Sequence, residues 1–102
     1  MQTRITARHT TLTDGLRGYI ESSVSKLGRY YNGIHDAHVV LDGREGLSKT
    51  AEVKLHVYRR TLTAQDAAPT HQEAVTGCVR QLRRQVLRYK DRVRDTSQDV
   101  HR

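Results

Sequence analysis

The chain has 102 residues, of which 35% are hydrophobic and 28% are charged, so it can bury one modest core and cannot form a multidomain enzyme. Its 18 Lys and Arg residues outnumber 11 Asp and Glu residues, and the net charge of +7 favours a polyanionic partner, nucleic acid before an anionic membrane. No window is apolar enough to span a bilayer and the first residues lack the apolar run of a secretion signal, so we expect a cytoplasmic protein.

The N-terminal third predicts a strand followed by a helix. Residues 2–8 alternate polar and apolar side chains, as a half-buried strand does. Thr13 is a candidate N-cap, and apolar residues then recur at helical spacing, which predicts a helix over 14–30. The pair Asn32-Gly33 tolerates the positive φ of a turn and ends this helix.

The middle of the chain predicts three more strands. Positions 37, 39 and 41 are apolar and share one face of the first of these strands, and the glycines and charges of 43–49 indicate a hairpin loop. The strongest alternation covers 50–58, which predicts one buried face and one solvated face. The next turn is assigned to Arg59-Arg60, and 61–65 forms the last strand.

The C-terminal third predicts a long amphipathic helix. Thr70 and Glu73 have the spacing of a capping box directly after Pro69, and apolar residues follow three or four apart for five turns. The single cysteine, Cys78, lies in this apolar pattern, so we expect a buried, unreactive thiol. We assign residues 1–95 to one domain and residues 96–102 to a flexible tail.

The element order is therefore βαβββα. Because the strands alternate between solvated and buried residues, both helices should cover the same face of a four-stranded sheet. A right-handed crossover makes the first two strands parallel and the sheet mixed. The expected fold is a two-layer α+β sandwich.

The exposed side of the last helix carries the clearest functional signal. Seven basic residues and one acidic residue, Asp91, lie between positions 80 and 94. Four form a row opposite the apolar stripe and three flank it: Arg80, Arg84, Arg88 and Arg92 in the row, with Arg83, Lys90 and Arg94 beside it. Like charges four residues apart destabilise a helix by roughly 0.2 to 0.5 kcal/mol per pair, so this row works against folding. A solvated helix face is the alternative, but the arginine fork suits phosphate, which favours binding to nucleic acid.

Other chemistry has little support in the sequence. The six histidines lack the spacing of a metal site, and no phosphate-binding loop, nucleophile motif or acid–base pair is present. We therefore predict no metal, no cofactor and no enzymatic activity. Tyr30 and Tyr31 could stack on unpaired bases, but Tyr31 fits the apolar stripe and is assigned to the core, whereas the role of Tyr30 stays open.

Five segments together resemble one known family: ITARHTTLTDGLRGYIESSVSKLGRYY, AHVVLDG, TAEVKLHV, TLTAQ and VRQLRRQVLRYKDRVR. They resemble the ribosome hibernation promoting factors, also labelled sigma-54 modulation proteins, over residues 2–94. The resemblance implies a βαβββα fold similar to a double-stranded-RNA-binding domain. It also implies binding to the small ribosomal subunit, in the channel of tRNA anticodons and mRNA, which silences idle ribosomes.

The resemblance also implies site residues. Six basic positions match the family pattern and would contact phosphates of 16S rRNA: Arg17, Lys26, Arg84, Arg88, Lys90 and Arg92. Arg80 and Arg83 are added on the row of arginines alone. The segment 70–76 departs from the family pattern and keeps only Ala74 and the apolar Val75. Contacts that the family makes there through acidic residues and a tyrosine are therefore not carried over to this chain, whereas the expected fold is unaffected.

The length resembles the short form of the family, which pairs ribosomes only with a helper protein and lacks a dimerisation domain, so we expect a free monomer. The alternative function is a regulatory module that binds a protein such as a sigma factor. The row of arginines favours the ribosome.

Overall fold

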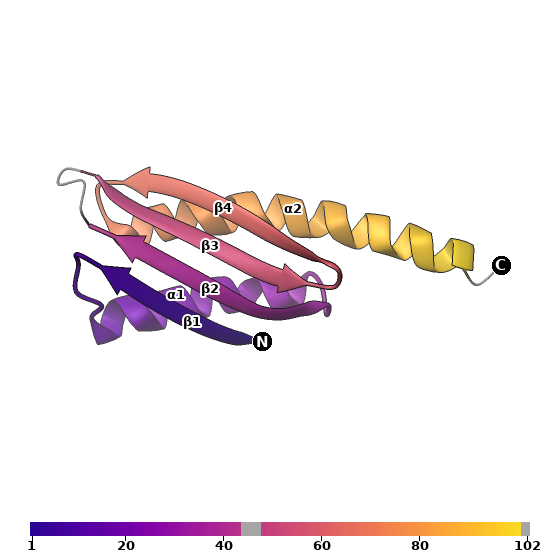
Figure 1. The fold of residues 1–102 in the computed structure, drawn as a ribbon, viewed down its shortest axis with the longest axis horizontal. Coiled ribbons are helices and arrows are strands. Elements are labelled where there is room, and N and C mark those ends of the chain that lie inside the picture. The colour runs from indigo at the N-terminus through magenta and orange to yellow at the C-terminus, as the bar shows by residue number, and fades with distance from the viewer. Residues whose placement is uncertain (44–47, 101–102) are drawn as a thin grey trace.

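A computed structural model of the chain describes residues 1–43 and 48–100, without the side chains of 93–100, and shows four strands and two main helices (Figure 1). The predicted element order is confirmed. The elements are β1 (Gln2–Arg8), α1 (Asp14–Ser25), the short 3₁₀ helix η1 (Lys26–Arg29), β2 (Ile34–Asp42), β3 (Lys49–Val57), β4 (Arg60–Ala68) and α2 (His71–Val100).

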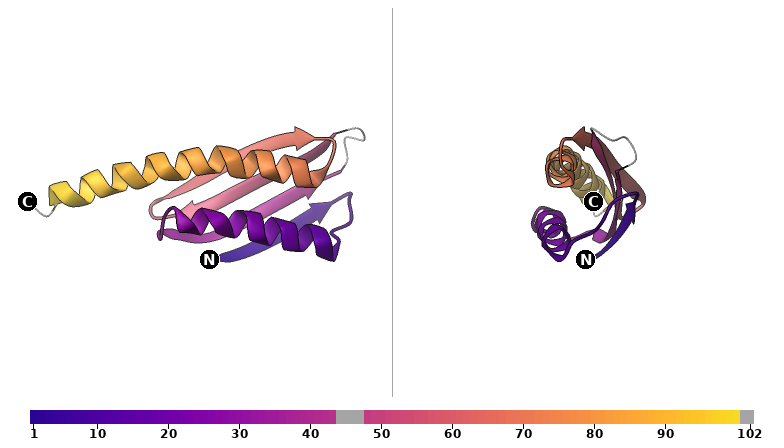
Figure 2. Two further views of the ribbon diagram at one scale, coloured as in Figure 1. Left: turned by 180° about the vertical axis from the view of Figure 1, so that it is seen from behind. Right: turned by 90° about the vertical axis from the view of Figure 1, so that its left-hand side faces the viewer.

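The strands form one mixed sheet in the order β1-β2-β3-β4. β1 and β2 are parallel, with Ile5 opposite Val39, and the other neighbours are antiparallel. Both helices lie on one face of this sheet, as the end-on view shows (Figure 2). The predicted two-layer α+β sandwich is therefore confirmed, and the other face of the sheet is uncovered.

The core lies between the helices and the inward face of the sheet. Alternate strand residues point inward, and Val53 on β3 is fully buried between Val39 of β2 and Ala64 of β4. The helices contribute Ile20 of α1 and Leu82 of α2, which are also fully buried. The buried and solvated faces predicted for 50–58 are therefore confirmed.

Three element boundaries differ from the predicted ones. The first helix is α-helical only to Ser25 and continues as η1 through Arg29. β4 continues three residues beyond Gln65, because its last residues pair with the first residues of β3. α2 continues to Val100, past the predicted domain boundary at 95. The flexibility of 96–102 stays a prediction. Residues 44–47 of the predicted hairpin loop lie outside the described residues.

The predicted turn between the last two strands is wrong by one residue. Tyr58 and Arg59 form the turn, whereas Arg60 pairs with Val57 as the first residue of β4. Arg59, the second residue of this two-residue turn, has φ of 67° and is in the left-handed conformation. The correction matters because it places the side chain of Arg60 on the edge strand β4 instead of in a loop.

The start of α2 agrees with the predicted cap. The Glu73 backbone N–H donates to Thr70 Oγ1 at 3.1 Å.

Two glutamines further along α2 cover the free edge of β4. The Gln81 amide donates to the Gln65 carbonyl and the Gln85 amide donates to the Thr63 carbonyl, each at 3.1 Å. These bonds satisfy edge carbonyls and fix one flank of α2 against β4.

Cys78 is expected to be unreactive in the folded protein. Its side chain is fully buried, its thiol donates to the Ala51 carbonyl at 3.4 Å, and burial followed by the charge of Asp66 raises its pKa to about 12. Because the thiolate is the nucleophile, a maleimide reagent at pH 7 should label Cys78 only when the protein opens. Mass spectrometry of native and urea-unfolded protein checks this, and fast native labelling would contradict it.

Two glycine-to-alanine substitutions in helices should have opposite effects on stability. A Cβ at Gly77 of α2 would collide with the carboxylate of Asp66, whereas a Cβ at Gly18 of α1 meets nothing within 4 Å. Gly18→Ala should therefore raise the free energy of unfolding by roughly 0.5 to 1 kcal/mol, because alanine loses less backbone entropy. Gly77→Ala should lower it despite the same gain. Urea unfolding of both variants measures the difference, and equal effects would show that Asp66 moves aside without cost.

Candidate nucleic-acid interface

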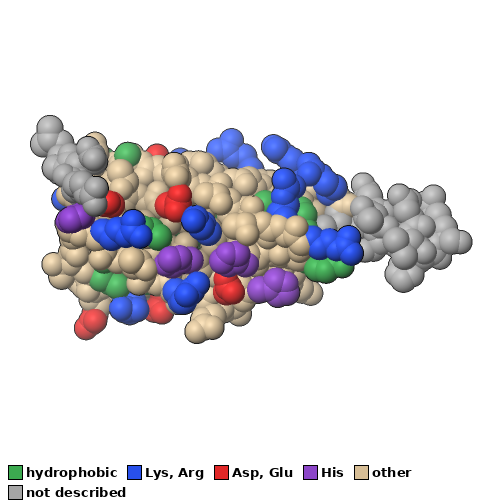
Figure 3. Space-filling view, viewed as in Figure 1, with side chains coloured by type: hydrophobic (Ala, Val, Ile, Leu, Met, Phe, Trp, Pro, Cys, Tyr) green, Lys and Arg blue, Asp and Glu red, His purple; other side chains and the backbone are tan. Residues whose placement is uncertain are grey.

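The uncovered face of the sheet carries balanced charge. It presents three basic and three acidic residues: Arg4, Arg8, Lys54, Asp36, Asp42 and Glu52. Lys54 forms a salt bridge with Glu52 at 3.7 Å, and a hydrogen bond from His56 lowers the pKa of Asp36. Figure 3 shows this face with basic, acidic and histidine side chains interspersed over the sheet. Such a surface has little net attraction for a polyanion.

The helix side carries an excess of basic residues. Its exposed or half-buried basic side chains are Arg17, Lys26, Arg29, Arg80, Arg83, Arg84, Arg88, Lys90 and Arg92. The exposed acidic side chains on the same elements are Asp14, Glu21, Glu73 and Asp91. Seven of the eight predicted site residues form no salt bridge with a described carboxylate: Arg17, Lys26, Arg80, Arg83, Arg84, Arg88 and Lys90. Their charges are available to a partner.

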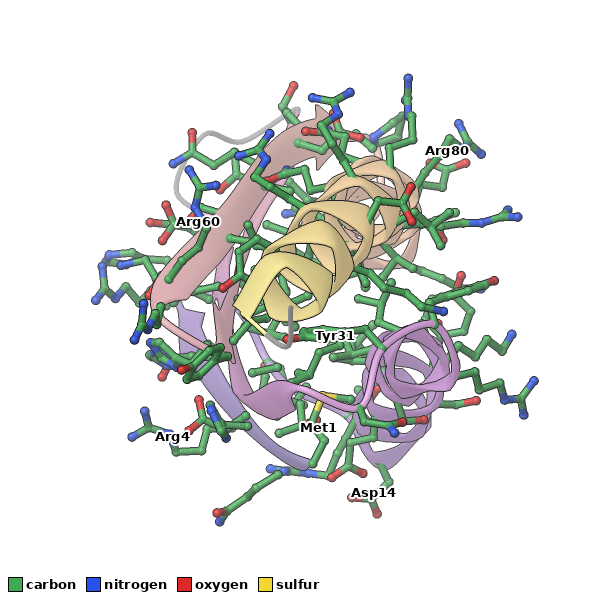
Figure 4. All side chains as sticks on the ribbon, turned by 90° about the vertical axis from the view of Figure 1, so that its right-hand side faces the viewer. Met1, Arg4, Asp14, Tyr31, Arg60 and Arg80 are labelled. Carbon is green, nitrogen blue, oxygen red and sulfur yellow. The ribbon has the colours of Figure 1, made fainter. Side chains whose placement is uncertain are left out.

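The row of arginines winds around α2. A step of four residues turns a helix by about 40° beyond a full turn, so the row moves steadily to one flank. Arg80 and Arg84 point away from the core, but Arg88 and Arg92 reach the flank that faces β4, where they line a cleft together with Arg60. Figure 4 shows Arg80 and Arg60 on opposite flanks of α2. The prediction that the whole row lies opposite the apolar stripe is therefore wrong for Arg88 and Arg92.

The other flank of α2 faces α1 and holds Arg83. The Arg83 guanidinium lies 5.3 Å from the centroid of the Tyr30 ring. Tyr31 packs against the core and meets Tyr89 of α2 edge to face, with ring centroids 5.9 Å apart. The assignment of Tyr31 to the core is confirmed. Tyr30, whose role the sequence left open, has one ring face occupied by Arg83, so a base would have to displace that guanidinium to stack there.

The predicted site does not form one cluster. Tyr19 of α1 donates a hydrogen bond to Thr76 Oγ1, whose own hydroxyl donates to the Gln72 carbonyl, so the start of α1, which carries Arg17, is level with the first turns of α2. From Thr76 to Arg88 the axis of α2 rises about 18 Å. The site therefore extends along the helix side, with Arg17 near one end and Arg88 and Arg92 toward the other.

Sequence reasoning missed one basic residue at this surface. Arg60 was assigned to a turn, but it begins β4 and its guanidinium lies 5.9 Å from the centroid of the Tyr89 ring. The two residues are far apart in the sequence. The run Tyr58-Arg59-Arg60 was the available signal, since basic and aromatic residues together are typical of nucleic-acid contacts.

The histidines form no metal site among the residues that the structure describes, where no group of three His, Cys, Asp or Glu side chains is suitably placed. His38 and His56 are diagonal neighbours on the uncovered sheet face, and His38 Nε2 lies 2.9 Å from Thr6 Oγ1. No helix in the described part of the chain combines the length and the apolar character needed to cross a membrane.

Comparison with known proteins identifies relatives over nearly the whole chain. Residues 3–94 match the family model described as Sigma 54 modulation protein / S30EA ribosomal protein. The Ribosome hibernation promoting factor of Escherichia coli (strain K12) is 29% identical over 94 residues, covering 92% of this chain and 98% of that protein. The Ribosome hibernation promotion factor of Staphylococcus aureus (strain COL) is 32% identical over 91 residues, which cover 87% of this chain but 48% of that protein.

Solved structures show the same fold. The crystal structure of the Thermus thermophilus Protein Y N-terminal domain matches with a TM-score of 0.77 and 26% identity, covering 84% of this chain and 94% of that one. A ribosomal subunit interface protein from Coxiella burnetii matches with a TM-score of 0.78, covering 89% of this chain and 99% of that one, and at 20% identity it supports the fold alone.

Proposed function

The chain belongs to the Sigma 54 modulation protein / S30EA ribosomal protein family, and from this membership we propose that it binds the small ribosomal subunit and inhibits translation by idle ribosomes. The observation that carries the proposal is the contrast between the two faces of the molecule. The sheet face balances its charges, whereas the basic residues of the helix side, Arg92 apart, form no salt bridge with a described carboxylate. Relatives named as ribosome hibernation factors support the ribosome as the polyanion.

The proposed contacts are electrostatic. Eight residues of the helix side contact phosphates of 16S rRNA: Arg17, Lys26, Arg80, Arg83, Arg84, Arg88, Lys90 and Arg92. Arginine donates two parallel hydrogen bonds to a phosphate, which explains why six of the eight are arginines. No catalytic step and no cofactor is needed, because occupation of the channel itself blocks translation. The free protein is a monomer, since its net charge of +7 opposes self-association.

Sedimentation through sucrose gradients tests the proposal. Purified protein is mixed with small subunits, large subunits and complete ribosomes over a series of salt concentrations, and the bound fraction is measured in each gradient. Binding should follow the small subunit, and the logarithm of affinity should fall steeply and linearly with the logarithm of salt concentration, by about 0.7 to 0.9 per phosphate neutralised. Binding to large subunits alone, or none, would contradict the proposal, as would unchanged cell-free translation at saturating protein.

A second candidate is a regulatory module for a protein partner, which the sigma-54 part of the family description favours. The balanced sheet face, with its His56–Asp36 hydrogen bond, is the surface suited to such a partner. Binding there should depend weakly on salt. Capture of a sigma factor that survives high salt and is lost on substitution of sheet-face residues would favour this candidate over the first.

A further inference from the structure

A cleft of about 170 Å³ lies between the start of β4 and the middle of α2. Its lining residues are Arg60, Leu62, Gln85, Arg88, Tyr89 and Arg92. Leu62 and Tyr89 are buried and form its floor, at 6% and 8% exposure. Three of the six residues carry positive charge and none carries negative charge. The walls are fixed by the pairing of Arg60 with Val57 and by the hydrogen bond from Gln85 to the Thr63 carbonyl.

Arg60 is held in place by an aromatic ring. Its guanidinium lies over Tyr89, which is itself wedged edge to face against Tyr31. This cation–π contact with Tyr89 leaves the N–H donors of the guanidinium for a ligand. The preceding residue, Arg59, adopts the left-handed conformation that starts β4 at Arg60. Arg60 is thus an ordered binding group, with no described carboxylate paired to it.

The chemistry of the cleft fits a phosphate better than a base. A base would need an open aromatic face, but the Tyr89 ring lies in the floor with Arg60 over it, and the exposed ring of Tyr58 at the neighbouring turn does not line the cleft. Arg60 and Arg88 line the cleft without a salt bridge to a described carboxylate, and their like charges repel each other. An oxyanion relieves this repulsion and accepts several charge-assisted hydrogen bonds.

We propose that Arg60, Arg88 and Arg92 together bind one phosphate group of an RNA strand, which makes Arg60 a binding residue contributed by the sheet edge. The inference rests on the proposed function, because it takes RNA as the source of the phosphate. It extends the RNA-binding surface from the helices across to β4. It also gives Tyr89, a core residue, the role of positioning Arg60.

The test compares Arg60→Gln with Arg4→Gln, which removes the same charge from the uncovered sheet face. The probes are a six-nucleotide single-stranded RNA, inorganic phosphate and a nucleoside triphosphate, and the readouts are fluorescence anisotropy and the NMR signals of the arginine Nε–H groups. RNA should shift the signals of Arg60, Arg88 and Arg92 together. Arg60→Gln should weaken RNA binding several-fold and lower the salt slope by about 0.7, the value for one phosphate of a single strand. Arg4→Gln should change both less, and Arg60→Lys should keep the slope but not the full affinity, since it lacks the fork.

Three results would overturn the inference: equal losses for Arg60→Gln and Arg4→Gln, no shift of the Arg60 signal on RNA addition, or tighter binding of the triphosphate than of RNA. The last would assign the cleft to a free anion. Sedimentation of the wild-type protein separates this test from the proposed function. Ribosome binding without an RNA response at Arg60 rejects the cleft alone, whereas an RNA response without ribosome binding rejects the proposed function alone.

Discussion

Replacing Arg84 and Arg88 together by glutamate is expected to abolish binding to the small ribosomal subunit without lowering the melting temperature. Both side chains are exposed on α2 and form no salt bridge with a described carboxylate. The wild-type helix has three repulsive pairs four residues apart, from Arg80 to Arg92. The two changes convert the outer pairs into attractive ones and leave the middle pair repulsive, so helix stability should rise by about 1 to 2 kcal/mol.

Binding should respond in the opposite direction. Two phosphate contacts are lost, which lowers the salt slope by about 1.4 to 1.8, and two new negative charges repel the rRNA. Arg84→Ala with Arg88→Ala removes the contacts without adding repulsion, so its loss of affinity should be smaller. The difference between the glutamate and alanine variants should shrink as salt screens the repulsion. Gradient sedimentation at several salt concentrations, with thermal melts of each variant, measures both effects.

The matched control moves the same charge change to the uncovered sheet face. Arg4→Glu with Arg8→Glu also replaces two exposed arginines by glutamates, but on the face where acidic residues already balance basic ones. If net charge alone governs binding, the two double variants lose affinity equally. If the helix side is the interface, the sheet variant keeps most of its binding. If the glutamate variant of α2 still sediments with small subunits and inhibits translation, the row of arginines is only a solvated helix face.

Most of the fold could be predicted because local patterns and burial agree. The alternation in β3 identified Val53 as a core residue, and register then followed, because a slip of one residue would turn the apolar side chains to water. The turn between β3 and β4 was the exception. Tyr58 and Arg59 carry none of the glycine or asparagine signals of a left-handed position, so the one-residue error came from turn chemistry that this sequence does not show.

The site was predictable in composition but not in shape. Exposure of Arg80 and Arg84 followed from the apolar stripe, and the winding of Arg88 and Arg92 toward β4 could have been found from the same helical period. The contact of Arg60 with Tyr89 could not, because it depends on how β4 docks against α2. The same holds for Arg83 of α2 and Tyr30, which directly follows η1. Periodicity gives the face of each element, whereas contacts between elements require the tertiary structure.

Replacing Val53 by aspartate is expected to prevent folding. Val53 is fully buried at the centre of the sheet between Val39 and Ala64. The substitution gives up about 1.5 to 3 kcal/mol of hydrophobic burial and places a carboxylate without a partner in the core, which costs several kcal/mol more. The sum is comparable with the whole stability of a small domain, about 5 to 15 kcal/mol. Leu82→Asp, on the fully buried side of α2, should act in the same way from the opposite layer.

The adjacent residue provides the control, because it projects from the other face of the same strand. The Lys54 side chain is 46% exposed and makes only a long salt bridge to Glu52, at 3.7 Å. Lys54→Asp therefore exchanges a weak surface attraction for a weak repulsion, and should cost about 1 kcal/mol or less. Circular dichroism in increasing urea should show no cooperative transition for Val53→Asp and a nearly normal one for Lys54→Asp. The reverse result would require the helices to pack on the opposite face of the sheet, which would place Arg60, Arg88 and Arg92 too far apart to share one phosphate.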